Sequence, residues 1–175
     1  MHAQAWYTRA VRLAASAVVL AAVAGCANDA PKPDAQLGPA SGIGRDGRPA
    51  VPGSARDFSV NVGDIVYFST DAVDLTPEAQ QTLDKQARWL QQYPQHTVTI
   101  EGHADERGTR EYNIALGARR ATAVRNFLVQ KGLAQARVRT ISYGKERPVA
   151  VCDDISCWSQ NRRAQTVLGS RGPGT

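Results

Sequence analysis

Residues 99–113 read Thr-Ile-Glu-Gly-His-Ala-Asp-Glu-Arg-Gly-Thr-Arg-Glu-Tyr-Asn, and in this segment a strand, a polar loop and a helix follow one another. Val98 and Ile100 alternate with polar residues over positions 97–101, which predicts a strand. Residues 102–108 are polar and predict a loop. From residue 109 to 131 apolar residues recur at helical spacing, and Gly132 caps the end. The side chains expected to face inward are Leu116, Ala123, Val124, Phe127 and Leu128.

Three further strands and one further helix are predicted on either side of this segment. A β-rich run covers residues 65–68, and Thr76-Pro77 begins a helix that ends before Pro94. Strands are expected at residues 138–143 and 163–168, the second after a short turn or helix near Trp158. The order β-α-β-α-β-β predicts an α/β sandwich (α+β) with two main helices on one face of a four-stranded mixed sheet.

The first 25 residues are predicted to be an export signal. Arg9 and Arg12 precede an apolar run over residues 13–24, which is too short to span a membrane as a permanent helix. Small residues end the run immediately before Cys26. This ending resembles the lipobox of bacterial lipoproteins, which implies that Cys26 is acylated and becomes the N-terminus. An ordinary cleaved signal and a buried N-terminal helix are the alternatives.

The rest of the chain divides into a tether, a domain and a tail. Residues 27–57 hold five Pro, five Gly and six Ala, a composition that predicts a flexible tether. Residues 42–47 match G-x-G-x-x-G, but they lack the strand and helix that a dinucleotide site needs. The domain is expected over residues 58–169, and residues 170–175 are expected to be a disordered tail.

Charge and composition exclude several classes of function. The net charge is +5, and removal of Arg9 and Arg12 with the signal lowers it to +3, well short of the dense basic stripe of a nucleic-acid binder. Three cysteines and three histidines are too few for a disulfide scaffold or a His-rich metal site. We therefore expect no cofactor, no metal and no nucleic-acid partner.

The polar cluster at residues 103–107 is the strongest candidate for a functional site. Metal binding through His103, Asp105 and Glu106 lacks the spacing that zinc sites show. Asp105 and Glu106 are adjacent, so they are poorly placed to act as a glycosidase pair on opposite sides of one bond. No nucleophile is tied to His103 by the sequence, and G-x-S-x-G is absent. A solvated loop with local ion pairs is the simplest alternative.

Four ordered blocks carry a resemblance to a known family. Residues 99–113, the Leu-Gly-Ala-Arg-Arg-Ala block at 116–121, and the blocks at 141–148 and 161–163 resemble OmpA-like domains. The match covers about residues 58–169 and is closest to the peptidoglycan-associated lipoproteins of that family, whose lipobox and tether it shares. The resemblance implies a non-enzymatic outer-membrane lipoprotein that faces the periplasm and binds peptidoglycan non-covalently. TolB and the other Tol proteins are implied as partners, with a role in envelope integrity and cell division. A cell-wall hydrolase of the periplasm is the alternative function.

The resemblance also implies the ligand, which is the diaminopimelate of peptidoglycan stem peptides. Its far end carries an ammonium and a carboxylate on one carbon. Asp105 is implied to bind the ammonium, and Arg120 is implied to bind the carboxylate through its planar fork. The backbone N–H groups of Thr70 and Asp71 would complete the carboxylate site, and Leu116 would wall the pocket. Diaminopimelate differs from lysine by this carboxylate, so Arg120 should set the specificity.

Seven further positions receive assignments that are not ligand contacts. Arg119 is expected to be solvated, since adjacent helical residues point about 100° apart. The Asn-Arg-Arg block at 161–163 is expected to pin the last strand. Cys152 and Cys157 are expected to form a short disulfide in an oxidising compartment, while free thiols and a metal site remain open. Ser69 stands where many relatives carry an acidic residue, which argues against an essential role for position 69.

Overall fold

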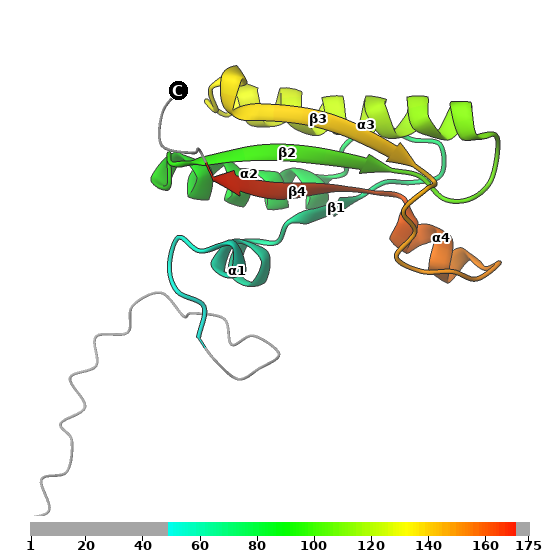
Figure 1. Ribbon diagram of the computed structural model, residues 1–175, viewed down its shortest axis with the longest axis horizontal. Helices are drawn as coiled ribbons and strands as arrows, with labels where there is room; N and C mark the ends of the chain where they lie inside the picture. The colour runs from blue at the N-terminus through cyan, green and yellow to red at the C-terminus, as the bar shows by residue number, and fades with distance from the viewer. Residues whose placement is uncertain (1–48, 171–175) are drawn as a thin grey trace, which may run out of the picture. The chain divides into compact units, whose positions relative to one another are not determined.

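The computed structural model describes residues 49–170 of the chain (Figure 1). The predictions for the signal peptide, for Cys26, for the tether before residue 49 and for residues 171–175 lie outside the described residues. Within residues 49–170, no helix combines the length and apolar character needed to cross a membrane.

Four strands form one mixed sheet in the order β1-β4-β2-β3. β4 runs antiparallel to β1 and to β2, while β2 and β3 run parallel. The predicted order of elements is confirmed, although Gly102 and His103 belong to a strand and not to the following loop because Gly102 pairs with both neighbouring strands. The bounds are β1 Ile65–Tyr67, β2 His96–His103, β3 Val138–Gly144 and β4 Arg163–Ser170.

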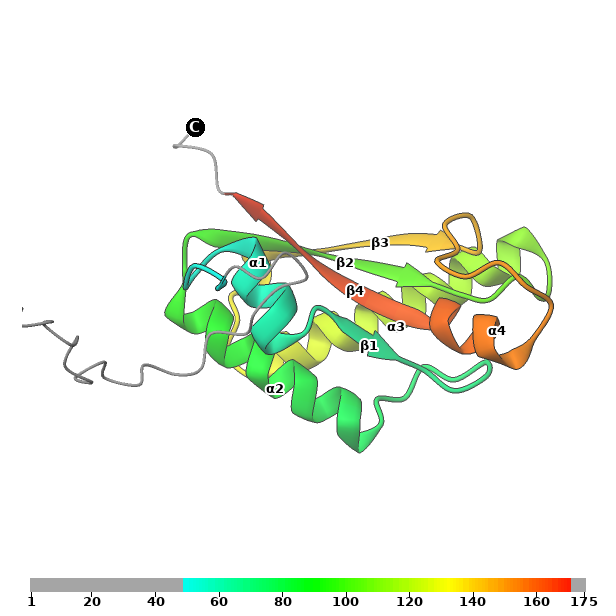
Figure 2. The ribbon, with the colours of Figure 1, turned by 90° about the horizontal axis from the view of Figure 1, so that it is seen from below.

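Two long helices, α2 (Pro77–Gln92) and α3 (Arg110–Gln130), lie on the same face of the sheet (Figure 2). Each begins at a threonine whose hydroxyl accepts a backbone N–H bond in the first turn, Thr76 in α2 and Thr109 in α3. The predicted helical layer is therefore confirmed. Two short helical segments, η2 (Gln135–Arg137) and α4 (Ile155–Asn161), precede β3 and β4.

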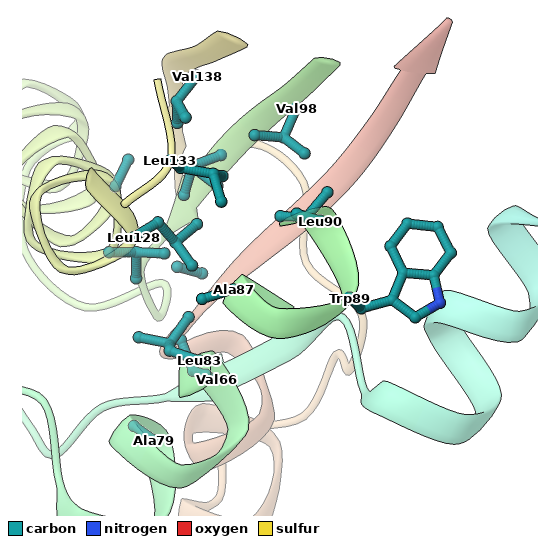
Figure 3. Packing of buried hydrophobic residues seen from close by; sticks show 14 of the residues in the cluster. Val66, Ala79, Leu83, Ala87, Trp89, Leu90, Val98, Leu128, Leu133 and Val138 are labelled. Carbon is teal, nitrogen blue, oxygen red and sulfur yellow. The ribbon is translucent and has the colours of Figure 1, made fainter. Parts of the chain in front are cut away.

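The hydrophobic core lies between the sheet and these two helices (Figure 3). Val98 of β2 packs with Leu83 and Leu90 of α2 and with Leu128 of α3, and all four side chains are buried. The five residues expected to face inward in α3 divide into two groups. Leu116, Val124 and Leu128 are buried, whereas Ala123 and Phe127 are half-buried.

The packed part of the chain begins before Phe58, which corrects the predicted tether boundary at residue 57. Ala50 is buried, and α1 (Ala55–Asp57) leads into a π-helix, η1 (Phe58–Val62). The Asp57 carboxylate accepts a 2.8 Å bond from the indole N–H of Trp89, and the Phe58 ring lies 4.9 Å from the Trp89 ring. The composition of this segment did not predict its packing, because its partners, Trp89 and His96, are distant in the sequence.

Candidate functional site

The carboxyl ends of β1, β2 and β3 lie at one end of the sheet, together with α4 and the start of α3 (Figure 1). The loops that follow β1 and β2 meet the first turn of α3 here. They enclose an open pocket of about 210 Å³. It is lined by Asp71, Asp105, Arg107, Gly108 and Tyr112.

Asp105 places a nearly buried carboxylate in the wall of this pocket, with 7% of its surface exposed. Its Oδ2 accepts a 2.6 Å bond from Arg107 Nη2 and a 3.3 Å bond from Arg162 Nη1. Burial raises the pKa of Asp105, but the hydrogen bonds from Arg107 and Arg162 outweigh burial and hold the pKa below its usual value. Asp105 is therefore a charged acceptor at neutral pH.

Arg120 reaches back from α3 to the same loops and is completely buried. It donates from Nε to the carbonyl of Ala72 (2.9 Å), from Nη1 to that of His103 (2.8 Å) and from Nη2 to that of Ser69 (3.1 Å). Its guanidinium carbon lies 5.0 Å from the centre of the Phe68 ring.

Arg120 is charged and points inward, whereas its neighbour Arg119 points to solvent. Burial lowers the pKa of Arg120 to about 10, although the charge of Asp105 opposes this effect, so the side chain stays cationic at neutral pH. Arg119 is exposed. The inward member of the arginine pair is thus the one that the sequence analysis selected.

The loop after β1 supplies the remaining predicted groups. Asp71 is the only described non-glycine residue with a positive φ, 53°, and its Oδ1 accepts a 3.4 Å bond from the Tyr112 hydroxyl. Among residues 49–170, neither Thr70 nor Asp71 donates its backbone N–H to a backbone or side-chain acceptor. Leu116 is buried and does not line the pocket. Tyr112, one turn earlier in α3, lines it instead.

Arg107 and Arg162 contact Asp105, and Trp158 contacts Arg107, but the sequence analysis did not select these three as site residues. Arg162 makes two hydrogen bonds to Phe68, directly after β1. Its Nε donates to the Phe68 carbonyl (3.2 Å), and its own carbonyl accepts from the Phe68 N–H (2.8 Å). The Arg107 guanidinium stacks 4.3 Å from the centre of the Trp158 ring, and the Trp158 indole N–H donates to Glu106. Arg107 and Arg162 lie in the quoted blocks, but no pattern shows that they meet at Asp105.

The remaining candidates lie outside this pocket. Cys152 and Cys157 are joined by a disulfide with their Cα atoms 5.7 Å apart, which links the loop before α4 to the first turn of that helix. His103 is buried, and burial, with the charges of Arg163 and Arg147, lowers its pKa to about 4, so the ring is neutral at neutral pH. Within the described part of the chain, no three His, Cys, Asp or Glu side chains are grouped to hold a metal ion.

The arrangement suits a ligand that carries both signs of charge. The Asp105 carboxylate lines the open pocket, whereas the Arg120 guanidinium is completely buried behind the lining residues, near enough for the charge of Asp105 to act on its pKa. A neighbouring ammonium and carboxylate on one small group would match both side chains.

Comparisons with known proteins place the chain in a family. Residues 67–164 match the model of the OmpA family. A peptidoglycan-associated lipoprotein from Rhizobium meliloti (strain 1021) is 60% identical over 155 residues, 89% of this chain and 86% of that protein.

Two solved structures share the fold. The crystal structure of the peptidoglycan-associated lipoprotein from Burkholderia pseudomallei has a TM-score of 0.59 and 43% identity, over 61% of this chain and 90% of that chain. The C-terminal domain of Helicobacter pylori MotB, at 21% identity, has a TM-score of 0.58 over 62% and 86% of the two chains and shares the fold alone. The chain therefore belongs to the OmpA family and, within it, to the peptidoglycan-associated lipoproteins.

Proposed function

We propose that this protein binds peptidoglycan non-covalently by gripping the diaminopimelate of its stem peptides, and that it performs no catalysis. The observation that carries the proposal is an ionised Asp105 carboxylate in the wall of an open pocket, with the buried Arg120 guanidinium close enough to feel its charge. Free diaminopimelate side chains present an ammonium and a carboxylate on a single carbon, which requires two such groups close together.

Each charge of the ligand has a matching group in this chain. The ammonium pairs with Asp105, whose lowered pKa keeps it ionised. The carboxylate pairs with Arg120 and with the backbone N–H groups of Thr70 and Asp71. Arg120 has five N–H donors and uses three of them on backbone carbonyls, which leaves two N–H donors for a ligand carboxylate that reaches it from the pocket.

The rest of the proposal concerns where the protein acts. Acylation of Cys26 anchors the chain in the outer membrane, and the domain faces the periplasm. Two acyl chains already make a stable anchor, since each buried methylene contributes about 0.8 kcal/mol. TolB and other Tol proteins are the proposed partners, which links the tether to envelope integrity and cell division. The naming of its relatives as peptidoglycan-associated lipoproteins supports the lipid anchor and the association with peptidoglycan.

The test is co-sedimentation of the protein with purified peptidoglycan sacculi. We expect the wild type to sediment with sacculi that contain diaminopimelate, and Asp105→Ala to stay in the supernatant because the ligand ammonium loses its counter-charge. Glu111→Ala, at an exposed position of the first turn of α3, is the matched control for loss of one carboxylate and should sediment like the wild type. Equal sedimentation of Asp105→Ala and wild type would overturn the proposal. Release of soluble wall fragments by the wild type would favour a hydrolase instead.

The anchor is tested separately by mass spectrometry of the protein purified from membranes. We expect the mature chain to begin at an acylated Cys26. A mature chain that begins elsewhere, with Cys26 unmodified, would remove the lipoprotein part of the proposal and leave the binding site unaffected.

A further inference from the structure

Arg107 occupies the position beside Asp105 that the ligand ammonium would take. Its Nη2 lies 2.6 Å from Asp105 Oδ2, and its backbone N–H donates to Asp105 Oδ1 at 3.3 Å. Arg107 also lines the same pocket as Asp71 and Asp105. We propose that Arg107 is an affinity-setting residue that competes with the cationic group of the ligand for Asp105 and must leave it for binding to occur. This inference rests on the proposed diaminopimelate site and adds a regulating residue to it.

The two arginines on Asp105 differ in how free they are to leave. Arg162 has 8% of its side chain exposed and is held by the Phe68 carbonyl, so it stays in place as part of the wall. Arg107 has 43% of its side chain exposed, and its guanidinium contacts Asp105 and the face of the Trp158 ring. An ion pair with one exposed partner is weak enough for a ligand to replace.

Trp158 provides a cation–π contact for Arg107 that does not depend on Asp105. The guanidinium already stacks 4.3 Å from the centre of the indole ring, and the indole N–H is fixed by Glu106. Arg107 can therefore release Asp105 while its cation keeps a favourable contact with the ring. The Trp158 ring reports this movement, because the position of the guanidinium over the ring changes when Arg107 leaves Asp105.

This competition has a consequence for ligand selection. A ligand that offers only an ammonium, such as a lysine side chain, exchanges one cation for another at Asp105 and gains little. A ligand that also carries a carboxylate gains a new contact with Arg120, which Arg107 cannot mimic. Arg107 thus weakens binding of every ligand that competes for Asp105. Only a ligand whose carboxylate also binds Arg120 compensates for this loss, so diaminopimelate is favoured over lysine.

The test is calorimetry on the full mature chain in detergent with a diaminopimelate-containing tripeptide and its lysine counterpart. We expect Arg107→Gln to bind the diaminopimelate peptide about three- to tenfold more tightly than the wild type, because a partly exposed ion pair no longer has to be broken. Arg110→Gln removes the same charge from an exposed side chain on the next helix and should bind like the wild type.

Tryptophan fluorescence provides an independent readout. We expect the peptide to change the emission of the wild type, and we expect this change to be lost in Trp158→Phe and reduced in Arg107→Gln. If the wild type binds the peptide and Arg107→Gln binds it no more tightly, the competitor role is wrong and the proposed function stands. If neither the wild type nor Arg107→Gln binds the peptide, the proposed function fails and the competitor role fails with it.

Discussion

Arg120 is a buried cation that holds the loop after β1 against the end of β2, and in the proposed function it also binds the ligand carboxylate. Its three hydrogen bonds join the loop after β1 to the end of β2 through carbonyls at Ser69, Ala72 and His103. A guanidinium can serve three acceptors in different directions because its donors are fixed in a plane. Position 120 therefore constrains the fold of the site as well as its chemistry.

Arg120→Lys should lower both stability and binding, even though it keeps the charge. One ammonium cannot reach the three carbonyls together, so we expect a loss of about 2–3 kcal/mol in the free energy of unfolding. The loss of a forked contact to the ligand carboxylate should weaken binding roughly ten- to a hundredfold. Urea denaturation and calorimetry with the diaminopimelate peptide measure the two effects.

Arg119→Lys is the control for this substitution, because Arg119 is exposed on the same helix. It should match the wild type in both measurements. Wild-type stability and affinity in Arg120→Lys, or a strong effect of Arg119→Lys alone, would contradict the assignment.

At the scale of elements, β2 and α3 approach one another so closely that only glycine fits at the crossing. A Cβ built on Gly102 would collide with the backbone carbonyl of Gly117, and one on Gly117 would collide with the Ser142 hydroxyl. This contact holds the start of α3 against the end of β2 and therefore sets the spacing between Arg120 and Asp105.

Gly102→Ala should consequently destabilise the domain by about 3 kcal/mol, because a backbone carbonyl cannot move aside as a side chain can. The measurement is the midpoint of urea denaturation. A lower midpoint with an unchanged dependence of the unfolding free energy on urea concentration reports a loss of stability and not a change in compactness. Gly169→Ala is the matched control, since its Cβ would lie 2.8 Å from Thr97 Oγ1, a side-chain atom that can rotate away. Equal midpoints for the two variants would show that the crossing tolerates a methyl group.

The disulfide between Cys152 and Cys157 closes a short loop directly before Trp158 and so supports α4. Closing a loop of this size contributes about 2 kcal/mol on the chain-entropy estimate. We expect a reductant to lower the melting temperature of the wild type by about 5–10 °C and to leave a double Cys→Ser variant unchanged. Thiol labelling before and after reduction verifies the redox state. A wild type that melts identically in both states would show that the loop is held by other contacts.

For the whole molecule, stability should fall in mild acid because of His103. Its pKa is about 4 in the folded chain and about 6.5 when unfolded, so between these values the unfolded chain binds more protons and acid favours unfolding. The full shift corresponds to about 3 kcal/mol, lost as the pH falls from about 6.5 to 4. Neither ring nitrogen has a hydrogen-bond partner among the described residues, although Glu101 Oε2 lies 3.8 Å from Nε2.

Urea denaturation at several pH values between 7 and 4 tests this expectation. His103→Gln should remove most of the slope in this interval. Below about pH 4, the stability of the wild type and of His103→Gln should still fall, because Asp105 and Asp57 have lowered pKa values. Burial raises the pKa of each of these two carboxyls, but hydrogen bonds to the carboxylate outweigh burial. The stabilisation that these hydrogen bonds give is lost when the two carboxylates are protonated. An unchanged slope in His103→Gln would assign the acid sensitivity to another group.

The sequence by itself determined the order of the elements and the place of the site in that order. Alternation at Val98 and Ile100 and the threonine starts at Thr76 and Thr109 act over a few residues, so they can be read without tertiary contacts. The family motif likewise selected Asp105 and the inward arginine, because both lie in one contiguous segment.

Only the tertiary structure decided which side chains meet at Asp105. Arg162 reaches it across 57 residues of chain, and Trp158 reaches Arg107 from the short helix before β4. The same holds for residues 50–57, which pack because Trp89 of α2 is there to receive Asp57. Such contacts depend on the direction of each side chain after the sheet and helices have packed, and local sequence pattern does not contain that direction.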